Sequence, residues 1–426
     1  MEIIQLLEKL FPICRSITGN GVRQTLNILS ELAPIKQLEF PTGIQVFDWI
    51  IPKEWNIKDA YIKDKQGNKL VDFKENNLHV LGYSVPINKK VSKQELLSHI
   101  ITLPDMPDAI PYATSYYKER WGFCIEHKRL ENFIDDEYEV CIDSKLEEGF
   151  LTIGEGYIQG KIEDEILLST YVCHPSMANN ELSGPVVQTF LYKYLLSKKS
   201  DLNYSYRFLY VPETIGSITY LAHYGDVLKQ KVKAGYVITC IGNDAPFTYK
   251  KSKQGDSLSD RAAINVLKSY NKEFNILDWF PWGSDERQYC SSGFNLPVGS
   301  LMCSLYGTYK EYHTSLDNLD FISEQAIKNS IQTYIDIIES IETNEIYINT
   351  NPHCEPQLGK RGLYPNLGSQ KSYESYIKKI QWLLALSDGK HDVIDIAEKL
   401  NLPAKDFKDE INKLIEAGLL ERYSRK

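Results

Sequence analysis

The stretch Glu165-Ile166-Leu167-Leu168-Ser169-Thr170-Tyr171-Val172-Cys173-His174-Pro175 decides the fold class. Its mostly apolar part, residues 165–172, predicts a buried strand, and a histidine follows directly at the carboxyl end. After a short loop, a helical pattern begins at Leu182-Ser183-Gly184. Ligand and metal sites of open α/β sheets form outside the carboxyl ends of the strands. The stretch therefore predicts both a sheet and the edge of that sheet where a site lies.

Strands and helices alternate in the same way from residue 150 to 345. The predicted strands are Ile166–Val172, Tyr206–Val211, Gly235–Ile241 and Leu296–Met302, and the predicted helices are Leu182–Ser197, Ile215–Val227, Arg261–Tyr270 and Ser323–Ile341. Such alternation predicts an α/β fold with a mostly parallel sheet flanked by helices. We expect residues 1–36, which read as two short helices, and residues 150–345 to form this domain together.

Three further segments complete the predicted organisation. Residues 37–149 read as short strands and turns, and predict an inserted β-rich domain. Residues 346–372 are rich in Asn, Pro and Gly, and predict a linker. Residues 373–426 show three short helical patterns with turn spacing that predicts a winged helix-turn-helix. Residues 371–426 carry 11 Lys or Arg and 10 Asp or Glu, so this module is nearly neutral. That balance weakens a DNA-binding interpretation, and leaves a protein partner or an oligomer contact equally open.

The composition limits the class of protein. The net charge of −9 argues against a broad surface for nucleic acid or anionic membrane. No apolar run approaches the roughly 20 residues that span a bilayer, and no signal peptide is visible at the N-terminus. The eight cysteines are scattered without a C-x-x-C pair. We therefore expect a cytoplasmic protein with reduced thiols, acting on a small molecule or a peptide.

Two histidines are candidate metal ligands. His174 lies at the end of a strand, and Pro175 favours an extended conformation for it. His313 lies in Tyr312-His313-Thr314-Ser315-Leu316-Asp317, where Asp317 or a backbone group can accept the second ring N–H. Neutral imidazole is a good ligand for zinc. Each histidine can also be a structural residue, and that alternative stays open on the sequence alone.

Candidate oxygen ligands and proton-transfer groups follow other predicted strands. Glu213 is either a general base or a solvated loop residue. Asn180 either coordinates through its amide oxygen or caps the next helix. In Ser284-Asp285-Glu286-Arg287, the charges either pair internally or serve the site. In the second case Asp285 binds metal, and Arg287 grips an anionic substrate group.

A last group is assigned to substrate binding. Aromatic residues of the inserted domain are more often core residues, but they can also form a lid that stacks on a peptide or a sugar ring. The residues assigned to substrate binding are Tyr116, Tyr117, Trp121 and Glu286.

The order of these motifs resembles the zinc aminopeptidase fold. More narrowly, the chain is similar to a bacterial family of aminopeptidase-like proteins associated with polysaccharide biosynthesis, which carry an inserted β-rich domain and a C-terminal winged helix. The motifs of the narrow family are Cys14-Arg15-Ser16-Ile17-Thr18-Gly19, Cys173-His174-Pro175-Ser176 and Gly283-Ser284-Asp285-Glu286-Arg287. The resemblance covers nearly the whole chain.

The resemblance places His174 at the first metal ligand, His313 at the last and Glu213 at the catalytic glutamate. Asn180, Thr214 and Thr239 stand where that fold has acidic ligands. Two metal ions need several carboxylates to offset their charge, so these neutral residues predict one zinc or other divalent ion, or none. Asn180 or Asp285 would complete the single site.

The resemblance leaves three functions open. The first is a single-metal hydrolase of an amide or peptide bond. The second is a catalytically inactive binding or regulatory protein that uses its winged helix. The third is a zinc-dependent acyl transferase of the glutaminyl-cyclase type.

Overall fold

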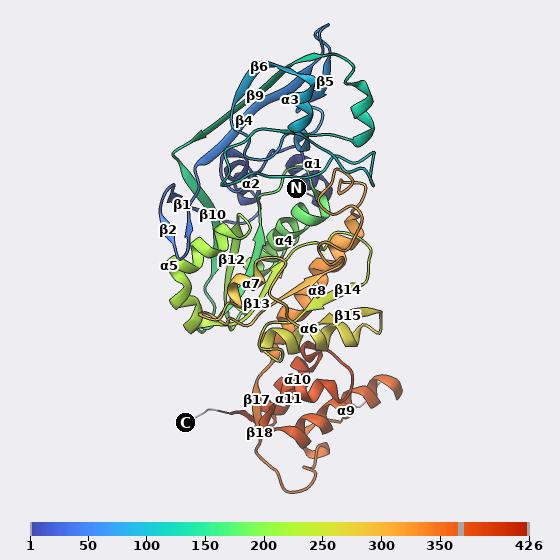
Figure 1. Cartoon of the computed structure of the whole chain (residues 1–426). Coiled ribbons are helices and arrows are strands. Elements are labelled where there is room, and N and C mark those ends of the chain that lie inside the picture. The colour runs from blue at the N-terminus through green and yellow to red at the C-terminus, as the bar shows by residue number, and fades with distance from the viewer. Residues whose placement is uncertain (1, 365–369, 424–426) are drawn as a thin grey trace.

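The computed structural model describes residues 2–364 and 370–423. Its three parts follow one another along the molecule: an inserted β-rich part, a large central sheet with helices, and a small helical part at the C-terminus (Figure 1). Within the described residues, no helix combines the length and the apolar character that crossing a membrane requires. All eight cysteines lie in the described part and are free thiols.

The central domain is built on one eight-stranded sheet. Its strands are β1 (Lys36–Pro41), β10 (Phe150–Ile158), β11 (Glu165–Tyr171), β12 (Ser205–Val211), β13 (Val232–Ile238), β14 (Phe247–Lys250), β15 (Phe274–Leu277) and β16 (Val298–Met302). The spatial order is β1-β10-β12-β11-β13-β16-β14-β15. The four central strands β12, β11, β13 and β16 are parallel. β1, β10 and β14 run antiparallel to their inner neighbours, so the predicted mostly parallel sheet is confirmed at its centre.

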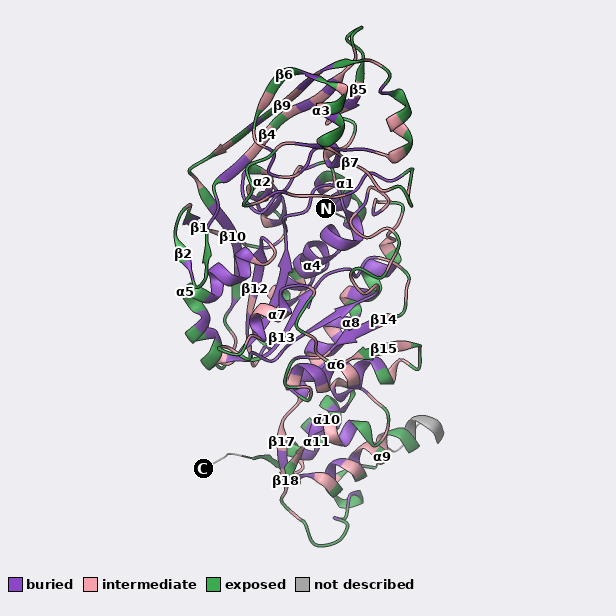
Figure 2. Ribbon diagram, viewed as in Figure 1, coloured by how far each residue is buried: buried purple, intermediate pink, exposed green. Residues whose placement is uncertain are grey.

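Helices cover the sheet because its central strands are apolar on both faces. The helices of this domain are α1 (Ile3–Leu10), α2 (Asn20–Ser30), α4 (Ser183–Ser197), α5 (Ile215–Lys231), α6 (Leu258–Ser269), α7 (Glu286–Tyr289) and α8 (Glu324–Thr343). Ile166 and Leu168 of β11 belong to the core with α1, α4 and α8. Leu167 and Tyr171 alternate with them and belong to the other core, with α5 and the inserted part. Figure 2 shows that the central strands and α4 are almost wholly buried.

Two local departures from the predicted elements matter for the site. A π-helical turn, Ala178–Leu182, precedes α4. β13 ends at Ile238, so Thr239 and the next two residues leave the sheet earlier than the predicted end at 241. Cys240 then has φ 49°, which turns the chain sharply across the carboxyl edge of the sheet. Both features place polar groups at that edge.

The inserted part is β-rich, as the sequence predicts. Its strands are β2 (Gln45–Val46), β3 (Trp49–Ile50), β4 (Glu54–Lys63), β5 (Lys69–Asp72), β6 (Ile87–Ser92), β7 (Ile100–Ile101), β8 (Phe123–Cys124) and β9 (Glu137–Glu147), with helix α3 (Lys93–Ser98). An antiparallel sheet has the order β5-β4-β9-β6. The predicted boundary at residue 37 is displaced, because residues 36–41 pair with β10 in the central sheet.

The C-terminal part contains a three-stranded sheet and three helices. They are β17 (Ile346–Asn349), α9 (Gln370–Leu386), β18 (Asp388–Asp392), α10 (Val393–Glu398), α11 (Lys408–Glu416) and β19 (Leu420–Arg422). The predicted linker therefore begins too early, since β17 pairs with β18 and β19. Residues 365–369 of the linker lie outside the described residues.

Ion pairs hold the C-terminal part against the central domain. Arg261 of α6 contacts both oxygens of Asp392 at 2.6 Å, and also contacts Asp395 at 2.8 Å. Lys405 contacts Asp336 of α8 at 2.6 Å. Asp392 also caps α10 by accepting the Asp395 amide, so one carboxylate serves both the helix and the contact between the two parts.

Candidate metal centre and active site

The candidate site lies where three adjacent parallel strands end. β11 leads to His174, β12 leads to Glu213, and β13 leads to Thr239. The carboxyl ends of parallel strands share one edge of a sheet, so residues far apart in the sequence meet there. A loop that follows β16 brings His313 to the same place, with its ring centroid 5.5 Å from that of His174.

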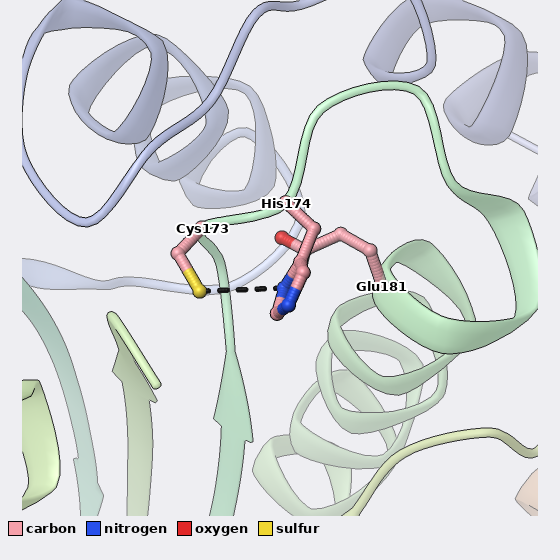
Figure 3. Close-up of side chains that lie close together, drawn as sticks. All are labelled: Cys173, His174 and Glu181. Carbon is pink, nitrogen blue, oxygen red and sulfur yellow. Dashed lines mark hydrogen bonds and ion pairs between the residues drawn. The ribbon is translucent and has the colours of Figure 1, made fainter. Parts of the chain in front are cut away.

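His174 is oriented from one side by Glu181 (Figure 3). Its Nδ1 lies 2.9 Å from Glu181 Oε2 and 3.4 Å from Cys173 Sγ. Its Nε2 lies 3.6 Å from Glu213 Oε2. Burial lowers the pKa of His174, but the hydrogen bond and the charge of Glu181 outweigh burial, so the pKa is raised. A carboxylate on one ring nitrogen leaves the other nitrogen to face a ligand or a metal.

His313 lies in an aromatic setting that favours its neutral form. The Tyr112 ring lies 5.0 Å from the His174 ring and 5.1 Å from the His313 ring, and Tyr312 stacks on His313 at 3.9 Å. Burial, and then the nearby His174, lower the pKa of His313 to about 3. Its Nε2 is buried and has no hydrogen-bond partner among the described residues. A buried unpaired imidazole nitrogen is costly unless something binds it.

The π-turn before α4 is fixed by Asp317. The amides of Ala178, Asn179 and Asn180 donate to its carboxylate at 3.2, 2.6 and 2.8 Å. Asp317 therefore does not pair with His313, which was the predicted alternative. Free amides at the start of a helix attract a carboxylate, and here the carboxylate comes from a distant loop.

Asn180 lies inside this turn, so the interpretation of Asn180 as a helix cap is wrong. Its Nδ2 donates to the hydroxyl of Tyr171 at 2.6 Å. Its Oδ1 is buried without a hydrogen-bond partner in the part of the chain that the structure describes. This oxygen belongs to a side chain that contacts Tyr171, whose ring lies 5.1 Å from the His174 ring.

Glu213 stands beside a strained turn that Asp285 and Arg287 hold. Thr214 has φ 67° and ψ −74°, an unfavourable conformation for a β-branched residue. Its amide donates to Asp285 Oδ1 at 2.8 Å, and Arg287 Nη2 donates to its hydroxyl at 2.9 Å. Burial, followed by the charge of Glu213, raises the pKa of Asp285 to about 7. Burial also raises the pKa of Glu213. The two carboxyl groups therefore disfavour simultaneous ionisation.

The predicted substrate-binding residues lie in different places. Tyr116 is near the site, because its hydroxyl lies 3.0 Å from that of Tyr112. Tyr117 packs against Trp49, and Trp121 stacks on His99 at 3.6 Å. Both side chains thus have aromatic partners within the inserted part, and their role as a lid stays a prediction.

Glu286, also predicted to bind substrate, is fully buried. It lies 2.6 Å from Lys250 Nζ and accepts from the Tyr306 hydroxyl at 2.8 Å. Its charge is thus used inside the protein. The alternative that the charges of the 284–287 segment pair with one another does not hold for Glu286, because its partner is Lys250 and not Arg287.

One compact group of potential metal ligands occurs among the described residues: Cys173, His174 and Glu181, whose ligand atoms lie within 4.8 Å of one another. The Arg15 guanidinium lies 3.4 Å from Glu181 Oε1, and burial raises the pKa of the Cys173 thiol well above its usual range. A nearby cation and a neutral thiol do not suit a metal ion. This group is better explained as an internal network.

The opposite side of His174 is the alternative place for a metal ion. There His174 Nε2 lies 3.6 Å from Glu213 Oε2, and the His313 ring lies 5.5 Å from the His174 ring. His313 Nε2 and Asn180 Oδ1 are buried and have no hydrogen-bond partner among the described residues. Two nitrogens and one oxygen are a donor set that zinc accepts. Sequence reasoning missed Glu181 and Tyr112, and gave no role to Arg15. The signals were the carboxylate next to Asn180 and the arginine in the Cys14–Gly19 motif.

Comparisons with known proteins agree with this fold. Residues 4–344 match the family described as a domain of unknown function, DUF4910, and residues 345–422 match a winged helix-turn-helix family. A Clostridium acetobutylicum protein is 50% identical over 420 residues, covering 99% of this chain and 96% of the relative. That relative is provisionally named a polysaccharide biosynthesis protein with an aminopeptidase-like domain. The winged helix is therefore confirmed.

Solved structures extend the comparison. The crystal structure of a presumed peptidase from Clostridium acetobutylicum has a TM-score of 0.92 at 48% identity, covering 99% of this chain and 96% of that chain. A zinc aminopeptidase from Bacillus subtilis has a TM-score of 0.54 at 11% identity, covering 78% of this chain and 93% of that chain. The second likeness shows the fold alone, which is the predicted aminopeptidase fold.

Proposed function

The chain belongs to the DUF4910 family, and we propose that it is a hydrolase of an amide or peptide bond that depends on a single zinc ion. One observation carries the proposal: the rings of buried His174 and partly buried His313 lie 5.5 Å apart at the carboxyl edge of the sheet, and His174 Nε2 lies 3.6 Å from Glu213. The aminopeptidase-like fold supports a hydrolase of this general kind. The neutral residues Asn180, Thr214 and Thr239 argue for one ion in place of two.

His174, His313 and Asn180 would hold the ion. Zinc, when bound, supplies a Lewis acid that polarises a carbonyl group or a water molecule. Asp285, the other predicted oxygen ligand, instead ties the Thr214 amide and the Ser217 hydroxyl. We assign it the task of positioning Glu213, because it fixes the turn that immediately follows that residue.

Glu213 would move the proton. Its side chain is one quarter exposed, so it faces the open side of the site. Its raised pKa brings it closer to neutral pH, where a carboxylate can accept a proton from water and return it to the leaving amine. Arg287 adjoins this carboxylate and has a buried Nε without a hydrogen-bond partner among the described residues. It is therefore available to orient an anionic group of the substrate.

The inserted part restricts the substrate. Tyr112 donates its amide to the His313 carbonyl at 2.8 Å, and Ser315 donates its amide to the Ile110 carbonyl at 2.9 Å. These bonds hold the inserted part against the loop that carries His313. A small substrate is therefore favoured over a folded protein. The name of the Clostridium relative supports a substrate from polysaccharide biosynthesis, such as an amide on a sugar. A protein or DNA partner of the winged helix is proposed only from its fold.

Metal analysis tests the proposal. After zinc reconstitution we expect one ion per chain in the wild type and loss of that ion in His174→Ala and His313→Ala. His223→Ala, which alters an exposed histidine on α5, is the matched control and should keep the ion. Glu213→Gln should keep the zinc but lose about 10²- to 10⁴-fold in kcat on aminoacyl amides or N-acylated amino sugars. A wild type without stoichiometric zinc, nickel or manganese would refute the proposal.

A ligand-binding protein without chemistry is the second candidate. The observation in its favour is that the neutral replacements bond to one another: Thr239 donates to the Asn180 carbonyl at 3.1 Å, and Asn180 donates to Tyr171. Such a network is stable without a metal. If ligands bind equally to the wild type and to Glu213→Gln, and neither of the two proteins hydrolyses them, this second candidate replaces the hydrolase.

A further inference from the structure

Arg15 and Glu181 form a buried ion pair directly behind His174. Both side chains are inaccessible to solvent, and Arg15 Nε lies 3.4 Å from Glu181 Oε1. Arg15 comes from the loop between α1 and α2, whereas Glu181 comes from the π-turn before α4. The pair therefore joins two segments that are distant in the sequence.

The pair holds His174 at two points. Arg15 Nε donates to the His174 backbone carbonyl at 2.9 Å, while Glu181 Oε2 contacts the ring at Nδ1, 2.9 Å away. The contacts close a ring that runs from Arg15 through the backbone and side chain of His174 to Glu181, and back to Arg15. Both the position of the strand end and the rotation of the imidazole are thereby fixed.

Arg15 is itself held rigidly. Its Nη1 donates to the Leu10 carbonyl at 2.8 Å, which anchors the guanidinium to the end of α1. A buried ion pair contributes little net stability compared with apolar residues of similar volume, because removing two charges from water is costly. A role in specifying one geometry is therefore the better explanation for this pair.

The π-turn gives Glu181 its place. In a π-turn the backbone is wound more widely than in an α-helix, and such turns are frequent at functional sites. Asp317 pins three amides of the turn, so Glu181 cannot easily move away from His174. Its neighbour Asn180 points to Tyr171, while Glu181 points to the histidine.

We propose that Arg15 and Glu181 are positioning residues that keep the proton of neutral His174 on Nδ1 and present Nε2 to the site. This inference rests on the proposed function only for the last step, the use of Nε2 by a metal ion. Arg15 offsets the charge of Glu181, so the pair orients the ligand without adding net negative charge to the centre. Carboxylate partners of metal-bound histidines act in this way.

Two separate measurements test this proposal: one follows the tautomer of His174, and the other follows the zinc affinity. Long-range ¹H–¹⁵N NMR of the metal-free protein, above the pH at which the ring is doubly protonated, should show a proton on Nδ1 of His174. Glu181→Leu and Arg15→Met should give a mixture of tautomers. Zinc affinity, measured by chelator competition, should fall about 10- to 100-fold in Glu181→Leu. Glu181→Asp, whose shorter side chain falls short of Nδ1, should behave likewise.

Glu165→Leu is the matched control. Glu165 is equally buried and pairs with Arg207 at 2.7 Å, at the opposite end of the same strand. The Glu165→Leu variant should be less stable than the wild type but should keep the same tautomer of His174. An unchanged tautomer in folded Glu181→Leu and Glu181→Asp would overturn the inference. Failure of the wild type to bind zinc, with the tautomer still dependent on Glu181, would refute the proposed function and leave the positioning pair standing.

Discussion

Removing the carboxylate of Glu286 tests whether this residue balances a buried charge or binds the substrate, as the sequence predicts. In the structure Lys250, at the end of β14, contacts Glu286 at 2.6 Å, and both side chains are fully buried. Lys250 Nζ also donates to the Trp282 carbonyl at 2.8 Å and the Tyr306 hydroxyl at 2.9 Å. Burial lowers the pKa of Lys250, and Glu286 opposes that effect.

Breaking a buried pair leaves an uncompensated charge and costs about 3–5 kcal/mol. Glu286→Gln leaves Lys250 with two neutral acceptors, so we expect a loss near the lower limit, about 3 kcal/mol in the free energy of unfolding. Glu286→Gln combined with Lys250→Met removes both charges. The double variant should therefore be more stable than the sum of the two single losses predicts, with a coupling energy of about 2 kcal/mol.

Urea unfolding, followed by tryptophan fluorescence, measures the four members of this cycle. Glu119→Gln is the matched control, because Glu119 pairs with Lys53 on the surface, where an ion pair contributes less than about 1 kcal/mol. A loss below about 1 kcal/mol in Glu286→Gln, together with weaker substrate binding, would show that Glu286 faces the substrate. The pair with Lys250 would then not be the main role of this carboxylate.

Three other predictions concern the metal site and the winged helix. Asn180→Asp should raise zinc affinity at least about 10-fold in chelator competition, since it adds a charged oxygen to the predicted ligand set; unchanged affinity would place Asn180 outside that set. Arg261→Ala should loosen the winged helix and speed proteolysis between residues 350 and 372, whereas Lys268→Ala, which removes a more exposed pair with Glu398, should not. Burial raises the pKa of Asp392, but Arg261 outweighs it and holds the pKa below the usual 3.8. The folded state then binds fewer protons than the unfolded state, so this stabilisation is present above about pH 4 and is lost as the pH falls further. Small-angle scattering should show separation of the winged helix from the central domain on acidification, and unchanged scattering down to pH 2.5 would contradict this.

Much of the fold follows from local patterns. The apolar run before His174 and the regular alternation after it predict a sheet whose central strands are parallel, and the order of the strand ends brings His174 and Glu213 together. β17 could not be predicted from the sequence, because four residues inside an Asn- and Pro-rich segment are too few to show the alternation of apolar and polar residues that is typical of a strand. Tyr347 is buried in the core that the C-terminal part shares with the central domain, which a short local pattern cannot reveal.

The contact partners of the charged residues could not be predicted from local sequence patterns. Lys250 is the partner of Glu286, at a distance of 36 residues in the sequence, and it becomes a partner only when β14 joins the sheet. Trp121 could be a lid or a core residue on sequence alone, and its partner His99, 22 residues away, becomes a neighbour only in the folded chain. A short motif identifies the type of side chain, while the tertiary fold determines which group it contacts.

The carboxylates around the two imidazoles favour the proposed single metal ion over a pair of ions. Arg15 compensates Glu181, and three backbone amides compensate Asp317. Asp285 is held by the Thr214 amide and by a hydroxyl, and its raised pKa favours the neutral form. Among these carboxylates, Glu213 is the one that is partly exposed to solvent and that could offset the charge of a metal ion. One carboxylate offsets half the charge of one divalent cation, and the two imidazoles would supply its nitrogen ligands; a second cation nearby would add two positive charges with no further carboxylate to offset them.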